Sequence, residues 1–170
     1  MRNETRDTLR GGLYAGLIGY VTIVVFFAIV NVAAGRSPFH TAALFGSAMF
    51  FDLQDPGQVV VTAPAVLTFN MVHALVMLGA GLVTSWLVSL SEKYPVAQWA
   101  VLVALIFVGF HLFAAMQLFS ARLLGSLGWV QITAASVAAA AAMGWFFLGT
   151  HPLLRRELHD VAMGEVPPAA

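Results

Sequence analysis

Long stretches of apolar residues without charge dominate the hydrophobic pattern of this chain. Four of them are long enough to cross a bilayer as helices, at about residues 13–34, 64–90, 96–120 and 126–150. A helix advances only about 1.5 Å per residue, so it needs about 20 predominantly apolar residues to span the hydrocarbon layer. The pattern therefore predicts four transmembrane helices.

The connections between the four stretches differ greatly in length. Residues 91–95 form a tight link between the second and third stretches, and the link before the fourth stretch is also short. Short links place consecutive helices side by side and antiparallel. The sequence thus predicts an all-α membrane protein, an antiparallel four-helix transmembrane bundle. We expect one transmembrane domain over residues 1–156 and a short flexible tail over 157–170, which is rich in small and polar residues.

The long connection between the first and second spans has a helical pattern of its own. Ser37 and Pro38 are residue types that favour the start of a helix, and apolar residues follow at helical spacing as far as Leu53. A run of this length is too short to cross the bilayer. The pattern predicts an extra interfacial or re-entrant helix at about 38–53, and His40 is the candidate contact if this helix covers a binding site.

Composition supports an integral membrane protein and excludes several other classes. Hydrophobic residues make up 60% of the 170 residues and charged residues only 9%, against about 25% charged in an average soluble domain. An ordinary soluble enzyme and a disordered chain are excluded on this ground. Eight basic residues balance eight acidic residues, so no basic surface for nucleic acid is expected. The chain has no cysteine, which excludes disulfides and thiolate metal sites.

The distribution of lysine and arginine predicts the orientation. With four spans both termini lie on one side, and six basic residues belong to that side: Arg2, Arg6, Arg10, Lys93, Arg155 and Arg156. Only Arg36 and Arg122 belong to the other side. Positively charged loops stay inside, so both termini are expected in the cytoplasm. Short loops and the lack of cysteine suit the cytoplasmic (inner) membrane of a bacterium.

Small residues mark close-packing faces on the first and fourth spans. The first span contains Gly12-x-x-x-Gly16 followed by Gly19, and the fourth is rich in alanine over 134–142. Helices in lipid associate through such residues because small side chains let backbones approach closely. Packing within the bundle is the simpler interpretation, and a dimer interface is the alternative.

Two histidines within the spans are the most specific feature of the chain. On the second span one helical face carries polar, small and flexible residues, namely Asn70, His73, Met77, Gly81 and Thr84. His73 and His111, the latter on the third span, each lie about eight residues from the predicted outer ends of their helices. Both therefore sit roughly 12–14 Å below the outer interface. Because these helices are antiparallel neighbours, we expect the two imidazoles to meet.

Paired intramembrane histidines have several interpretations, which the sequence leaves open. They can hydrogen-bond to each other, to Asn70 or to a carbonyl, and hold two helices in register. They can be axial ligands of a b-type haem, with Arg36 and Arg122 as weaker candidates for contacts to the propionates. Such a bundle is similar in architecture to the haem-bearing anchor subunits of quinone-linked oxidoreductases, although the chain carries no shared motif. Copper or another transition metal, held by both histidines with help from His40, and a substrate or proton path are further alternatives.

Missing motifs exclude most self-contained enzymes. No Asp, Glu, Lys or Arg lies inside any predicted span, and no catalytic triad, phosphate-binding loop or zinc-protease motif occurs. We therefore expect a small multi-pass membrane protein without its own catalytic site, an accessory subunit of a larger membrane complex or a homo-oligomer in the lipid bilayer. The alternatives are a di-histidine haem b protein in membrane electron transfer and a small oligomeric permease for a metal or small solute.

Overall fold

The computed structural model describes residues 2–93 and 129–151, and every regular element within these ranges is helical. Three helices are long: α1 (Arg2–Ala33), α3 (Ala63–Lys93) and α5 (Trp129–Thr150). A shorter helix α2 (His40–Phe50) and the 3₁₀ turn η1 (Pro56–Gln58) lie between α1 and α3. The all-α class is thus confirmed for this part of the chain. The third predicted span and the C-terminal tail lie outside the described residues.

The three long helices each contain a segment that is long and apolar enough to cross a membrane. These segments are Thr5–Ala33, Ala63–Ser91 and Val130–Thr150. Helix α1 begins well before its apolar stretch, so its first turns carry Arg6, Asp7 and Arg10, all exposed. A helix that extends past the hydrocarbon in this way keeps its charged turns in water while its backbone groups stay paired.

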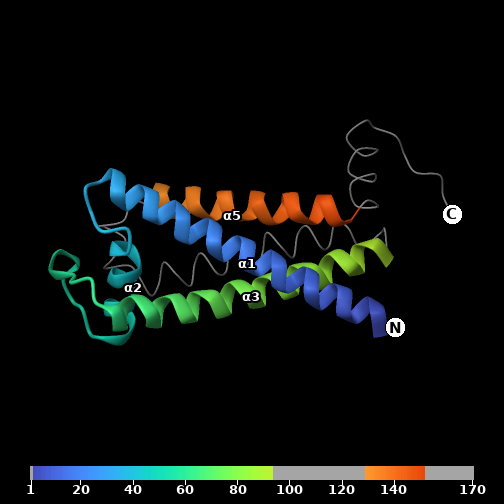
Figure 1. The fold of residues 1–170 in the computed structure, drawn as a ribbon, viewed down its shortest axis with the longest axis horizontal. Coiled ribbons are helices and arrows are strands. Elements are labelled where there is room, and N and C mark those ends of the chain that lie inside the picture. The colour runs from blue at the N-terminus through green and yellow to red at the C-terminus, as the bar shows by residue number, and fades with distance from the viewer. Residues whose placement is uncertain (1, 94–128, 152–170) are drawn as a thin grey trace.

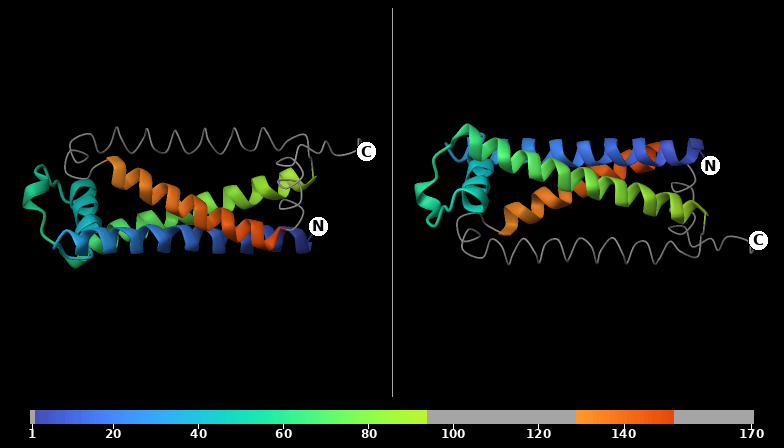
Figure 2. Two further views of the ribbon diagram at one scale, coloured as in Figure 1. Left: turned by 90° about the horizontal axis from the view of Figure 1, so that it is seen from above. Right: turned by 90° about the horizontal axis from the view of Figure 1, so that it is seen from below.

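Helix α1 runs antiparallel to α3 and α5 and packs against both (Figures 1 and 2). The N-terminus of α1 and the C-terminal ends of α3 and α5 lie at one end of the molecule. Helix α2 lies across the opposite end, beside the start of α3 (Figure 1). The molecule is therefore an elongated bundle that is capped at one end, and residues 36–59, which include α2 and η1, form the cap.

Glycines bring the backbones of α1 and α3 into direct contact. A Cβ added to Gly16 would lie 2.6 Å from the carbonyl oxygen of Met77, and one added to Gly12 would lie 2.7 Å from Cα of Leu82. A Cβ added to Gly81 would lie 2.7 Å from Cα of Gly16. The predicted close-packing face of α1 is thus used within the chain, where it meets α3.

Hydrogen bonds attach the cap to α1, and a close backbone contact attaches it to α3. Thr41 in α2 donates its hydroxyl hydrogen to Asn31 Oδ1 of α1 at 3.0 Å, and both side chains are buried. Asn31 Nδ2 also donates to the carbonyl of Pro38 at 3.2 Å. Gly46 lies against the backbone carbonyl of Ala65 on α3, where no side chain would fit. The cap is therefore attached to both α1 and α3.

Helix α2 begins later than the residue types predict. Its N-cap is Phe39 and its first residue is His40, so Ser37 is not the cap. Ser37 instead closes a turn before the helix: its hydroxyl accepts from the amide of Phe39 at 3.3 Å, and its carbonyl accepts from the amide of His40 at 2.9 Å. The Ser37 side chain therefore accepts its hydrogen bond within this turn, and the helix begins three residues later, at His40.

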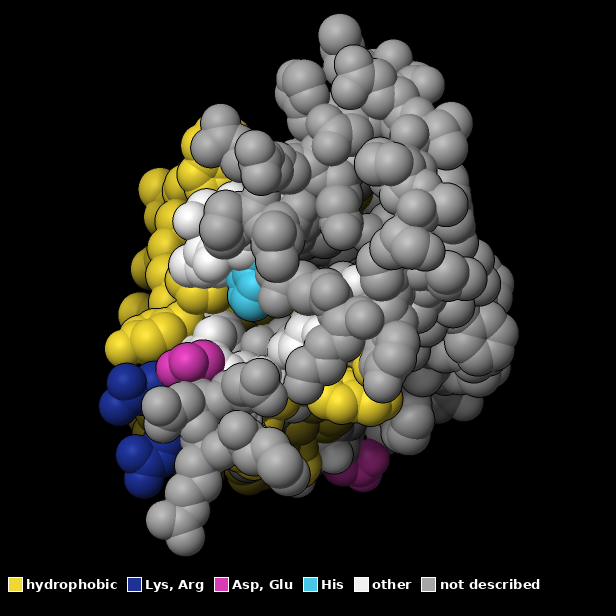
Figure 3. All heavy atoms as spheres, turned by 90° about the vertical axis from the view of Figure 1, so that its right-hand side faces the viewer, with side chains coloured by type: hydrophobic (Ala, Val, Ile, Leu, Met, Phe, Trp, Pro, Cys, Tyr) yellow, Lys and Arg dark blue, Asp and Glu magenta, His cyan; other side chains and the backbone are white. Residues whose placement is uncertain are grey.

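Large apolar side chains cover the outward faces of the helices. Leu75 is 67% exposed on α3 and Val137 63% on α5, while three exposed aromatic residues, Tyr14, Trp86 and Trp145, lie toward the end that holds the N-terminus. Figure 3 looks onto that end and shows an apolar flank beside basic side chains. An apolar surface bordered by exposed aromatic and basic residues is typical of a protein in a bilayer.

Candidate functional site

The imidazole of His73 lies between the aromatic rings of two helices. Phe69, one turn earlier on α3, stacks on it with ring centroids 5.5 Å apart and planes 9° from parallel. Tyr20 of α1 contacts it at 5.8 Å and 45°. Phe45 of the cap stacks on Phe69 at 5.3 Å, so aromatic rings continue from the cap to His73. The ring orientation of His73 is therefore restricted by packing on α1 and α3.

Asn70 takes part in the link between α1 and α3, but with a partner other than His73. The Tyr20 hydroxyl donates to Asn70 Oδ1 at 3.0 Å, and Asn70 Nδ2 donates to the carbonyl of Val66 at 2.8 Å. Both polar atoms of the Asn70 side chain thus have partners other than His73. The hydrogen bond between Asn70 and His73 that the sequence left open is therefore not seen in the structure.

The Nε2 atom of His73 is buried, and none of the described residues forms a hydrogen bond with it. A buried polar atom without a partner costs about 1–3 kcal/mol, so native proteins rarely keep one without a reason. An imidazole nitrogen in this condition has the chemistry of a ligand to a metal or haem iron, or of a donor to a bound molecule. His73 is therefore the strongest candidate site residue that the structure describes.

The other predicted site residues have separate surroundings or fall outside the described ranges. His111 and Arg122 lie outside the described residues, so the predicted meeting of His73 and His111 stays a prediction. Arg36 and His40 line one cavity of about 320 Å³ in the cap. Within residues 2–93 and 129–151, no group of three or more His, Cys, Asp or Glu side chains is placed to hold a metal ion.

The electrostatics of the cap affect His40. Burial lowers the pKa of His40 below its usual value of 6.5, and the positive charge of Arg36 lowers it further. At neutral pH the ring is therefore neutral, with one nitrogen able to donate a hydrogen bond and the other able to accept one. Arg36 was a candidate contact to haem propionates and His40 a candidate contact of a covering helix or a metal ligand, and the fold places both residues at one cavity.

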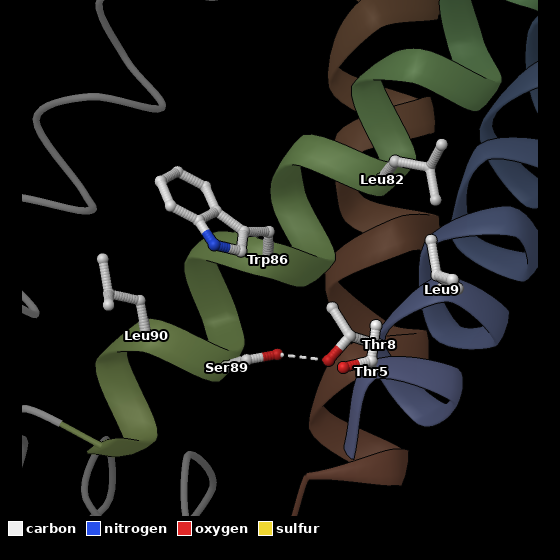
Figure 4. A pocket seen from close by; sticks show the side chains of 7 residues that line it. All are labelled: Thr5, Thr8, Leu9, Leu82, Trp86, Ser89 and Leu90. Carbon is white, nitrogen blue, oxygen red and sulfur yellow. Dashed lines mark hydrogen bonds between the residues drawn. The ribbon is translucent and has the colours of Figure 1, made fainter. Parts of the chain in front are cut away.

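A second cavity, of about 310 Å³, lies between α1 and α3 near the end that holds the N-terminus (Figure 4). Its lining combines hydroxyl and apolar side chains: Thr5, Thr8, Leu9, Leu82, Trp86, Ser89 and Leu90. Thr8 Oγ1 and Ser89 Oγ share a hydrogen bond of 3.0 Å, and Ser85 Oγ donates to the carbonyl of Thr8 at 2.7 Å. These bonds join the two helices where their glycine contact ends.

Sequence reasoning missed Tyr20, which supplies both a ring contact to His73 and a hydrogen bond to Asn70. A signal was present, because Gly12, Gly16 and Tyr20 follow one another at four-residue spacing and so share a helical face. On α3, Gly81, Ser85 and Ser89 also follow one another at four-residue spacing, so the same pattern marks the serines that bond to α1.

Comparisons of the chain with protein-family models, with curated proteins and with solved structures give no match. Two features of the described residues bear most directly on function: the apolar outward faces of the long helices and the buried nitrogen of His73.

Proposed function

We propose that this protein is a small multi-pass subunit of a larger membrane complex, without a catalytic site of its own. In this proposal the chain is an antiparallel four-helix transmembrane bundle in a bacterial inner membrane, with both termini in the cytoplasm. The distribution of side chains is the main support. Interhelical hydrogen bonds join α1 to α3, whereas large apolar side chains such as Leu75 and Val137 are turned outward. Such faces suit contact with lipid and with neighbouring transmembrane helices.

The absence of cysteine makes a cross-linking test direct, because any cysteine introduced is the only one present. We would place single cysteines at Leu75 on α3 and at Val137 on α5, and apply a thiol-reactive cross-linker in native membranes. Ser85→Cys is the matched control, since that position is 1% exposed. Cross-linked species of one defined mass from an exposed position support a subunit role. A protein that stays monomeric from both exposed positions contradicts it.

Ligation of a b-type haem is the second candidate function, and the unpartnered Nε2 of His73 favours it. A neutral imidazole held by aromatic packing is a suitable axial ligand, and such haems carry electrons within membranes. The second ligand in this hypothesis is His111. We would record reduced-minus-oxidised visible spectra of protein that was produced with haem precursor. Loss of one shared chromophore in both His73→Ala and His111→Ala supports haem ligation, while Tyr20→Phe is expected to retain it.

The cofactor-free protein offers an independent check on His73. If no ligand binds, His73→Phe removes the uncompensated burial of Nε2 and keeps the stack on Phe69. We then expect a gain in stability of about 1 kcal/mol, the low end of the cost of an unpaired buried group. A colourless wild-type protein that is stabilised by His73→Phe would overturn the haem hypothesis. The same result would not contradict the proposal of a subunit role.

A further inference from the structure

The cavity in the cap combines basic and apolar side chains at the end of a membrane-spanning helix. Arg36 follows the end of α1 by three residues, and His40 is the first residue of α2. Leu44 and Val59 contribute apolar surface to the same cavity, whose volume is about 320 Å³. The cavity thus brings two nitrogen-bearing side chains to a place near the end of the hydrocarbon-spanning part of α1.

The acidic residues of the cap form hydrogen bonds with their own neighbours in the chain and not with Arg36. Asp55 accepts hydrogen bonds from the amide of Gly57 at 2.8 Å and from Gln58 Nε2 at 3.2 Å. Asp52 accepts one from Gln54. In the part of the chain that the structure describes, no carboxylate pairs with Arg36. Its guanidinium therefore has its planar array of donors available for an external anion.

The surroundings of the cavity indicate what kind of anion fits. The apolar residues Leu44, Pro56 and Val59 line the cavity together with Arg36 and His40. A molecule held at Arg36 would therefore meet apolar side chains beyond its charged group. The amides of Phe39 and His40 already donate to Ser37, so recognition would come from side chains. A charged head with apolar chains attached matches this arrangement.

We propose that the cap cavity binds the phosphate group of an anionic phospholipid, with Arg36 as the principal contact and the His40 ring as a second donor. Arginine pairs with phosphate through parallel charge-assisted hydrogen bonds, which add geometric specificity to the attraction. Basic side chains next to a transmembrane helix are a common way to hold anionic headgroups. This site is distinct from the subunit role and from His73, and it needs only the cap and the bilayer.

The test uses the full-length protein, delipidated in mild detergent at high salt to screen long-range attraction. Thermal stability is measured while dihexanoyl phosphatidylglycerol is added, in parallel with dihexanoyl phosphatidylcholine and with inorganic phosphate. The variants are Arg36→Gln, Arg36→Lys and His40→Phe, and Arg10→Gln is the matched control. Arg10 is also an exposed arginine on or near α1, but it lies at the opposite end of the bundle.

We expect saturable stabilisation by phosphatidylglycerol, with an apparent Kd about tenfold or more higher in Arg36→Gln, since a hydrogen bond to a charged group is lost. Arg36→Lys is expected to lose part of the affinity, because the charge remains but the planar fork does not. Arg10→Gln is expected to stay within about twofold of the unmodified protein, because its charge lies outside the cap and salt screens distant charges.

Three results would overturn the proposal. Equal affinity in Arg36→Gln and Arg10→Gln would show that the cap cavity is not where the lipid binds. Equal stabilisation by phosphatidylcholine would show that the negative charge is not recognised. Saturation by inorganic phosphate at the same concentration as phosphatidylglycerol would keep the phosphate chemistry but exclude the lipid as the ligand that the cavity selects.

Discussion

Replacing Gly81 by alanine tests the backbone contact on which the packing of α1 against α3 depends. The new Cβ would lie 2.7 Å from Cα of Gly16 and still closer to backbone atoms of Gly12 and Gly16. The nearest of these atoms, the carbonyl oxygen of Gly12, would lie 2.3 Å away, whereas real Cβ atoms in ordinary contact stay at 3.4 Å or beyond, so the helices must separate by about 1 Å. Because backbone meets backbone, no side-chain rotation relieves the clash. We expect a loss of about 2–3 kcal/mol, in the upper part of the range for overpacking.

Gly79→Ala is the matched control, because it lies two residues away on the same helix and its added Cβ meets nothing within 4 Å. Both substitutions gain the same helix propensity, about 1 kcal/mol, so their difference isolates the contact with α1. Thermal unfolding in mild detergent, followed by tryptophan fluorescence, measures it. A difference of 2–3 kcal/mol corresponds to roughly 4–12 °C for a chain of this size.

Equal melting temperatures for Gly81→Ala and Gly79→Ala would refute the reasoning, since they would show that Gly81 does not meet α1. The molecular mass in detergent distinguishes the alternative of a dimer interface. If the glycine face joins two chains, Gly81→Ala lowers the mass of the particle. If the face is intramolecular, as in the structure, the substitution lowers stability and leaves the mass unchanged.

Three further predictions concern the cap and the link between α1 and α3. Asn31→Ala leaves the Thr41 hydroxyl without its buried acceptor, so we expect a loss of about 1–3 kcal/mol of stability in thermal unfolding. The exposed Val32→Ala is expected to change stability little, and equal losses in the two variants would contradict a stabilising role for the Thr41–Asn31 hydrogen bond. Tyr20→Phe removes one interhelical hydrogen bond, for which we expect about 0.6 kcal/mol, and a loss above about 2 kcal/mol would show a larger role. Burial lowers the pKa of His40 in the folded state, so the unfolded state binds more protons and stability is lost as pH falls below 6.5. Melting curves between pH 7.5 and 5.5 check this, and His40→Gln is expected to reduce the slope; an unchanged slope would contradict it.

The three long helices that the structure describes could be predicted from the sequence because the bilayer imposes a simple length rule. Uncharged apolar stretches become spanning helices, since unpaired backbone groups are too costly in hydrocarbon. The separate helix in the long connection followed from the same reasoning, and α2 is found there. The start of α2 was misplaced because Ser37 closes a local turn, and local residue types do not show which of two competing hydrogen-bond patterns will form.

The sequence by itself determined that His73 shares a helical face with Asn70 and Gly81, because a period of 3.6 residues decides which side chains point the same way. Only the tertiary structure decided that this face packs against α1, where it contacts Tyr20, Gly12 and Gly16. Periodicity defines a face but not its partner, since the partner depends on which backbones can approach closely enough. The same holds for the cap: Arg36 and His40 share a cavity because the chain turns back between α1 and α2.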